Sequence, residues 1–218
     1  FYWQWEGEGR HSRCIRQRGN FDALDHRYRW DDDSRTTTVT TAKGEQRVYQ
    51  HNAQARLLSK TGADGDQTRY EYDDNGNLLA EISPSGWATR YEYDALGQKV
   101  AEHFPDGRSR TYRWSGGRIC RMEEGPRVWR WRYNDSGDLL TAINPLQQET
   151  RHCYNARGQR TETRHPDGTT QRFQWGQEGE LLEESRSDGF SRRYEYDALL
   201  RVVAVTDADG GRTQYRYD

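Results

Sequence analysis

Carboxylates recur at fixed places in this sequence, and carboxylates are the groups from which proteins most often build acid–base and calcium sites. Five aspartates directly follow a pair of aromatic residues: Asp31, Asp73, Asp94, Asp197 and Asp218. None has a base at a fixed spacing beside it. Each stands where a turn is predicted to start, and there an aspartate accepts hydrogen bonds from backbone amides. We interpret these residues as turn caps, and we expect no catalytic residue and no enzyme activity.

Metal and cofactor chemistry is equally poorly supported. The runs Asp31–Ser34 and Asp73–Gly76 are acidic, but they lack the alternating spacing and distal glutamate of a calcium-binding EF-hand loop. The six histidines are scattered, and the three cysteines share no C-x-x-C spacing. No phosphate-binding, dinucleotide-binding or hydrolase motif occurs. The sequence therefore predicts no metal site, no cofactor and no disulfide framework.

The elements that position these residues repeat along the chain. Paired aromatic residues recur every 21 residues, except for one step of 19, and a fixed period of this size indicates one small structural unit used many times. The pairs begin at Tyr28, Tyr49, Tyr70, Tyr91, Tyr112, Trp131, His152, Phe173, Tyr194 and Tyr215. We interpret the repeated positions as architectural.

One repeat shows what the unit is. Tyr70 and Tyr72 flank a glutamate, so their rings are predicted to lie on one face of a strand. Asp73 begins a turn that Gly76 closes with a positive φ, and Leu78 starts the returning strand. A second turn then leads to the next aromatic pair. The unit is predicted to be a β-hairpin.

Other repeats place the same residue types at the same positions. The positions that we predict to be structural are, besides those above, Tyr91, Tyr93, Asp94, Gly97, Trp131, Tyr133, Gly137, Tyr194, Tyr196 and Asp197. In the last complete repeat Leu200 stands where glycine is expected. The second turns carry Asp-Gly at Asp64, Asp106, Asp167, Asp188 and Asp209. Turn formers recur too often for helices.

The predicted fold is all-β, a curved or spiralling antiparallel sheet of consecutive 21-residue hairpins. Two strands per repeat give about 18 to 20 strands, and a sheet this wide curls because strand twist accumulates. We expect residues 1–27 to be a degenerate repeat with a longer loop at 20–25, and residues 28–218 to be the repeat sheet. The repeat at Tyr112 is shortened at Gly116-Gly117 and again near Gly125-Pro126.

Composition excludes several other classes of protein. Hydrophobic residues make up 32% of the 218 residues, and many of them are aromatic, which suits a thin, half-exposed sheet better than a thick core. The 33 basic and 35 acidic residues are interleaved, so no basic patch for nucleic acid is predicted. No apolar run is long enough for a membrane span. Disorder is disfavoured by the aromatic content and the strict period.

These motifs resemble a known family. Tyr70-Glu71-Tyr72-Asp73-Asp74-Asn75-Gly76-Asn77-Leu78 and Tyr91-Glu92-Tyr93-Asp94-Ala95-Leu96-Gly97 are similar to the Y-x-Y-D-x-x-G-x-L pattern of Rhs/YD repeats, as is the segment beginning at Tyr194. The resemblance extends from Tyr28 to Asp218. The repeats at Tyr49 and His152 depart from the pattern, since they carry histidine within the aromatic pair and asparagine for aspartate.

The resemblance implies a function of enclosure. Rhs proteins wind such hairpins into a hollow β-shell that houses a C-terminal toxic domain, which in bacteria is often delivered into competing cells by type VI secretion. The implied partners are the rest of the shell, the enclosed toxin, and secretion spike proteins and a chaperone. The chain would be held in the cytoplasm before export and then be secreted or delivered at a cell surface. The family's self-cleavage motif, of the D-P-x-G-L type, does not occur here.

Two alternatives stay open at this point. Aromatic hairpin repeats of similar length also occur in modules that bind choline or cell-wall carbohydrate, where rings stack on the ligand. Edge strands of an open sheet also pair with other strands, so self-association is expected. Asn134-Asp135-Ser136 is a formal glycosylation sequon on a predicted turn, which we interpret as accidental.

Overall fold

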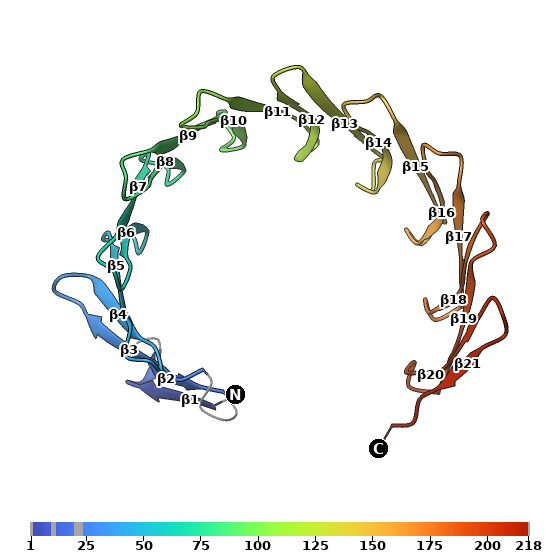
Figure 1. Ribbon diagram of the computed structural model, residues 1–218, viewed down its shortest axis with the longest axis horizontal. Coiled ribbons are helices and arrows are strands. Elements are labelled where there is room, and N and C mark those ends of the chain that lie inside the picture. The colour runs from blue at the N-terminus through green and yellow to red at the C-terminus, as the bar shows by residue number, and fades with distance from the viewer. Residues whose placement is uncertain (1, 10–11, 20–23, 218) are drawn as a thin grey trace. The chain divides into compact units, whose positions relative to one another are not determined.

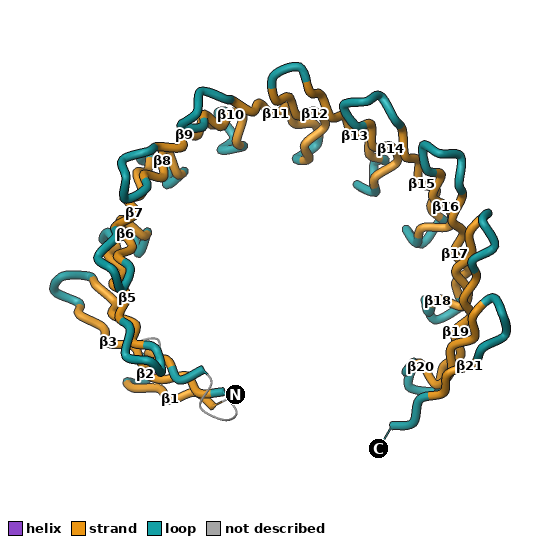
Figure 2. The backbone as a smooth tube through the Cα atoms, in the orientation of Figure 1, coloured by secondary structure: helices purple, strands orange, loops and turns teal. Residues whose placement is uncertain are grey.

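The computed structural model describes residues 2–9, 12–19 and 24–217, and within these ranges it consists of strands and turns without an α-helix. The chain divides into two compact units, Phe1–Thr111 and Tyr112–Asp218. Figure 1 labels the strands and Figure 2 separates strands from loops. The prediction of an all-β fold of consecutive hairpins is confirmed.

Each unit is an unclosed antiparallel sheet in which strands pair with their neighbours in sequence. The first unit contains β1 (Tyr2–Glu6), β2 (Arg13–Arg18), β3 (His26–Asp31), β4 (Thr36–Thr40), β5 (Gln46–His51), β6 (Leu57–Thr61), β7 (Gln67–Tyr72), β8 (Leu78–Ile82), β9 (Ala88–Tyr93) and β10 (Lys99–His103). β11 (Ser109–Ser115) spans the boundary. The second unit contains β12 (Arg118–Glu124), β13 (Arg127–Tyr133), β14 (Leu139–Ile143), β15 (Glu149–Tyr154), β16 (Arg160–Arg164), β17 (Thr170–Trp175), β18 (Leu181–Arg186), β19 (Ser191–Tyr196), β20 (Val202–Asp207) and β21 (Arg212–Gln214).

Within each unit, taken by itself, the strands succeed one another along a curved path (Figure 1). The described residues contain 21 strands, slightly more than predicted, because β1 and β2 pair with each other upstream of the regular repeats. Of the loop expected at 20–25, residues 20–23 lie outside the described residues. The predicted boundary between residues 27 and 28 stays a prediction.

Both kinds of turn share one backbone geometry. In the turn 73–77 the amide of Asp73 donates to the carbonyl of Asn77, and the amide of Gly76 donates back to the carbonyl of Asp73, each at 3.0 Å. The turn 83–87 repeats both bonds, at 2.8 and 2.9 Å. The last residue of this three-residue loop needs a positive φ, and Gly76 at that position has a φ of 93°. Leu200 occupies that position with a φ of 59°, so the turn forms even where glycine is missing.

Aspartate caps the two turns from different places. In first turns, which follow the aromatic pair, the Asp94 carboxylate accepts the amides of Leu96 and Gln98, both at 2.9 Å. In second turns the aspartate sits in the loop, and the Asp106 carboxylate accepts the amide of Arg108 at 3.1 Å. In both kinds of turn the aspartate therefore accepts the amide of the fifth turn residue, which is Gln98 in one case and Arg108 in the other.

A β-bulge accompanies the first turns. Tyr72 is opposite Leu78 and Glu71 is opposite Ala80, which leaves Leu79 as an extra residue in β8. The same one-residue shift recurs in seven other hairpins: β1–β2, β5–β6, β9–β10, β13–β14, β15–β16, β17–β18 and β19–β20. Bulges add local twist to a sheet.

The sheet has very little core. The buried hydrophobic residues of the described chain are three alanines of returning strands, among them Ala80, which is 0% exposed, and no large side chain is fully buried there. Ala80 lies opposite Glu71 on one side and Arg90 on the other, so long charged side chains cover it.

The shortened repeat that begins at Tyr112 has a two-residue turn instead of a three-residue loop, and Gly116 and Gly117 in this turn both have positive φ.

Candidate functional site: the joint between successive hairpins

The predicted structural positions lie at the contact between one hairpin and the next, which we call the joint. Tyr70 and Tyr72 lie in β7, and the pairs beginning at Tyr91, Trp131 and Tyr194 lie in β9, β13 and β19. Each of these rings is partly buried, whereas the residue between them is exposed. The rings therefore share one face of the strand, in agreement with the sequence pattern.

In most pairs the second aromatic residue bonds the preceding hairpin. The Tyr93 hydroxyl donates to the backbone carbonyl of Leu78 at 2.9 Å, and the Tyr196 hydroxyl donates to that of Leu181 at 2.8 Å. The acceptor is the first residue of the preceding returning strand, beside the bulge. The same bond is made by Trp30, Tyr72, Tyr133, Tyr154, Trp175 and Tyr217.

This bond explains a sequence signal that the pattern analysis missed. The second position holds only tyrosine, tryptophan or histidine, all of which carry a polar hydrogen, whereas the first position also accepts Phe173. A phenylalanine at the second position could pack but could not bind the carbonyl. The paired aromatics therefore serve both packing between neighbouring hairpins and a hydrogen bond from the second ring to the preceding hairpin.

A second contact crosses the joint between successive first turns. The guanidinium of Arg56 lies over Gly76 of the following first turn, and Nη2 is 3.4 Å from the carbonyl of Asn75. A Cβ at Gly76 would lie 2.1 Å from that nitrogen. Arg118 lies over Gly137 in the same way. Glycine is therefore favoured here for its positive φ, and a side chain at this position would displace the flexible end of the arginine.

Charged side chains pair across neighbouring hairpins on the face opposite the rings. The Glu162 carboxylate is 2.5 Å from Arg164 and 3.1 Å from Arg172 of the next hairpin. Hydrogen bonds from these two arginines lower the pKa of Glu162. Exposed ion pairs of this kind contribute at most about 1 kcal/mol each. They fix register more than they add stability.

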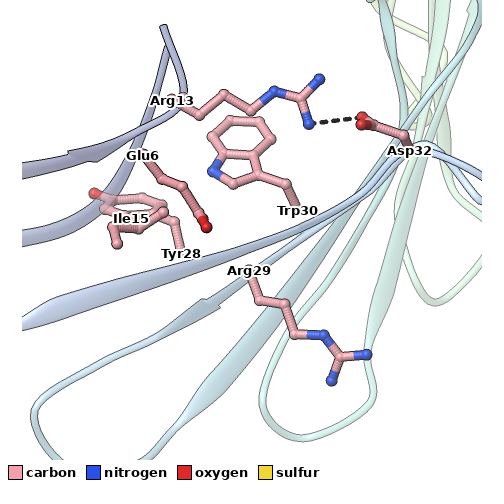
Figure 3. A pocket seen from close by; sticks show the side chains of 8 residues that line it. Glu6, Arg13, Ile15, Tyr28, Arg29, Trp30 and Asp32 are labelled. Carbon is pink, nitrogen blue, oxygen red and sulfur yellow. Dashed lines mark ion pairs between the residues drawn. The ribbon is translucent and has the colours of Figure 1, made fainter. Parts of the chain in front are cut away.

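A groove of about 620 Å³ near the N-terminus is lined by Glu6, Arg13, Tyr28 and Trp30, among others. Figure 3 shows the Arg13 side chain over the Trp30 ring, at 5.5 Å from its centroid, and paired with Asp32 at 2.6 Å. In the same view Arg29 points to the opposite side of β3.

This groove belongs to the joint as well. The Trp30 indole donates to the carbonyl of Cys14 at 2.9 Å, which is the bond made by the second aromatic of a pair. Comparable grooves of about 630 and 710 Å³ lie between the turns 73–77 and 94–98 and between the turns 155–159 and 176–180. A depression of this kind lies beside adjacent first turns in both units, and we interpret it as a feature of the repeat.

Comparison with known protein families decides what the repeat is. A protein-family model described as RHS Repeat matches residues 51–85, 72–109, 133–170 and 196–218, which together are more than half of the chain. The chain belongs to the RHS repeat family. The matched segments contain the RHS positions Tyr72, Tyr93, Tyr133 and Tyr196, whose hydroxyls bridge the joints.

Solved structures share the RHS fold. The chain is similar to the crystal structure of TcdB2-TccC3 without its hypervariable C-terminal region, with a TM-score of 0.52 and 14% identity over 84% of this chain. It spans 14% of the length of that chain. The Tc holotoxin pore of Photorhabdus luminescens, in a TccC3 variant, also has 14% identity, with a TM-score of 0.41, over 90% of this chain and 14% of its own. No curated protein matched the chain.

The residues first considered for chemistry take structural roles in the RHS hairpins. Hydrogen bonds from Asn77 lower the pKa of Asp73, and backbone and side-chain bonds from Arg201 lower that of Asp197. Asn134 binds both the amide and the carboxylate of Asp138, so its sequon nitrogen is engaged. Asp218 lies outside the described residues.

Metal-binding side chains do not converge in the RHS sheet. Residues 2–9, 12–19 and 24–217 contain no group of three or more His, Cys, Asp or Glu able to hold a metal ion. Cys120 and Cys153 lie in β12 and β15, and both are free, as is Cys14. No helix that could span a membrane occurs in these ranges.

Proposed function

We propose that this chain is a wall segment of an RHS-type toxin shell that encloses a C-terminal toxic domain. The observation that supports this most directly is the joint: the Tyr72, Tyr93, Tyr154 and Tyr196 hydroxyls each bind a carbonyl 15 residues earlier, so each hairpin is held by the one before it. Such nearest-neighbour bonding extends a sheet to any length. The fold shared with TcdB2-TccC3 supports the same reading.

The proposal includes the partners and the route of the toxin. The wall would contact the remaining shell and the enclosed domain, and secretion spike proteins and a chaperone would assist its export. We propose delivery into competing or target cells by type VI secretion from a bacterial producer, with the protein held in the cytoplasm beforehand. We also propose that this segment has no enzymatic activity, since its carboxylates serve turns and ion pairs.

The test uses the complete protein that carries this chain. The intact protein is digested with a non-specific protease, and survival of the region that follows the RHS repeats is followed by mass spectrometry. We expect that region to be protected in the wild type and to become cleavable when Tyr72, Tyr93 and Tyr196 are all changed to Phe. Equal cleavage of the downstream region in both proteins, with the RHS sheet intact, would contradict enclosure.

A carbohydrate-binding module is the second candidate. The observation in its favour is the groove beside Trp30, whose side chain is 42% exposed and is flanked by Glu6 and Asp32. Arg13 already covers one face of the ring, which argues against sugar stacking there. Binding of the chain to a cell-wall glycan array that is lost in Trp30→Ala and kept in Trp87→Ala would favour this alternative.

A further inference from the structure

His152 occupies a ring position of the joint and is chemically unlike the other rings. It begins the aromatic pair of β15, which lies between β14 and β16 (Figure 1). Its side chain is partly buried, and Nδ1 lies 3.0 Å from the hydroxyl of Thr163, a residue that is only 2% exposed. The slot thus holds the only kind of ring that can gain a proton near neutral pH.

The residue opposite the first ring of a pair varies between repeats, and in several it is glutamate. Tyr70 lies opposite Glu81, Tyr91 opposite Glu102 and Phe173 opposite Glu184. His152 lies opposite Thr163 instead. On its other side β14 has the sequence LLTAI, which contains no charged residue. Tyr28, Tyr49, Trp131 and Tyr194 also lack an opposite carboxylate, but His152 alone among these rings can gain a proton near neutral pH and so needs a counter-ion.

The charges that do face His152 are basic. Arg160 of β16 and His165 of the following turn act on it electrostatically, and both disfavour its protonation. The nearby carboxylates already form ion pairs: Glu149 pairs with Arg151, and Glu162 pairs with Arg164 and Arg172. In β17, Gln171 lies opposite Thr163 and is bonded to Glu184 of β18 at 2.7 Å. A proton on His152 therefore adds an unpaired positive charge beside Arg160.

We propose that the hairpin β15–β16 is acid-sensitive: protonation of His152 disrupts the packing of its ring and loosens the pairing of β15 with its neighbours. The physical cause is the cost of a charge at a partly buried position without a counter-ion. The inference concerns this sheet alone and holds whatever the wall encloses.

The direction of the pH effect follows from linkage. Burial first, and then Arg160 and His165, lower the pKa of His152 below 6.5. The unfolded or locally opened hairpin therefore binds the proton more tightly than the folded one. The contribution of neutral His152 to the stability of the hairpin β15–β16 is fully present above pH 6.5 and decreases as the pH falls below that value. His103 provides a contrast in geometry, because its Nε2 lies 2.8 Å from the Glu92 carboxylate.

Hydrogen exchange followed by mass spectrometry on the full chain tests the proposal. Exchange is compared at pH 7.5 and 5.5 after correction for intrinsic rates, in peptides covering residues 149–164 and, as a reference, residues 67–93. We expect exchange in 149–164 to rise in acid by several-fold, up to about tenfold. The reference segment should change little, because its ring positions hold tyrosine.

The repeat itself supplies the variants. His152→Tyr places the commonest ring of the repeat in the slot and should abolish the acid effect. Thr163→Glu reproduces the arrangement of Tyr70 with Glu81 and should also remove it, since the imidazolium then has a partner. His103→Tyr is the matched control and should keep the full effect in 149–164. An unchanged acid effect in His152→Tyr, or no acid effect in the wild type, would overturn the proposal.

Discussion

At the scale of single residues, the contact between successive hairpins depends on hydrogen-bond donors of the aromatic side chains. Tyr91 and Tyr93 stand two residues apart on one strand, yet only Tyr93 has a bond to the preceding hairpin among the described contacts. Burial raises the pKa of both hydroxyls, so both remain protonated and able to donate at neutral pH. Two tyrosines that look equivalent in the sequence therefore have different roles.

Substitution of these two tyrosines separates the roles. Tyr93→Phe removes the bond to Leu78 and leaves that carbonyl without this donor, so we expect a loss of about 1 kcal/mol in the free energy of unfolding. Tyr91→Phe makes the same chemical change without losing such a bond and should cost much less. Urea unfolding of both variants checks this. Equal losses would show that packing, and not the bond, holds the joint.

At lower pH, acid acts on a different residue, Asp25. Hydrogen bonds from Arg16, at 2.8 and 2.7 Å, lower the pKa of Asp25 to about 2. A lowered carboxylate pKa contributes stability that is present above the unfolded value of 3.8 and lost as the pH falls toward 2. We expect acid unfolding of the β2–β3 region between these values in a circular dichroism titration. Asp25→Asn should remove that part of the pH dependence while the behaviour near pH 6 stays unchanged.

At the scale of elements, the turns decide where the hairpins begin and end. The sequence predicted their positions correctly, because aspartate, asparagine and glycine act within four or five residues of chain. The bulge could not be predicted in this way. It depends on how Tyr72 and Leu78 face each other across the strand pair, and the residue types are compatible with a regular register as well.

Leu200 offers a test at this scale. It adopts a φ of 59° at a position where glycine is more favourable, because a left-handed conformation places Cβ close to the backbone. We expect Leu200→Gly to raise the free energy of unfolding by about 0.5 to 1 kcal/mol. Leu199→Gly lies in the same turn without a positive φ and should destabilise. Thermal unfolding of both variants distinguishes conformational strain from a general effect of glycine.

At the scale of the whole molecule, each unit is a single layer whose strands are stabilised by neighbours. Such sheets have edges, and an edge strand presents unpaired amides and carbonyls. In the described structure β1 pairs with β2 alone, and its residues are exposed throughout. Trp3 and Trp5 on this strand are 53% and 59% exposed. The edge is both apolar and open to pairing.

We therefore expect the isolated chain to self-associate through β1. The double variant Trp3→Lys/Trp5→Lys should lower the apparent mass at high concentration, because charge on an edge strand opposes strand addition. Trp87→Lys is the control, since Trp87 is 62% exposed but lies in a turn. Light scattering across a concentration series measures the effect. A wild-type chain that stays monomeric throughout would contradict the expectation.

The sequence by itself determined the period, the hairpins, the turn positions and the face of the rings, because these depend on interactions within one hairpin. Only the tertiary structure decided how hairpins are joined, by the Tyr93 hydroxyl on the Leu78 carbonyl and by Arg56 over Gly76. It also decided which residue lies opposite His152 in the strand pair β15–β16. These contacts link residues 11 to 20 positions apart across different strands. Their partners are set by strand register, which a bulge shifts by one residue and which no local pattern of residues encodes.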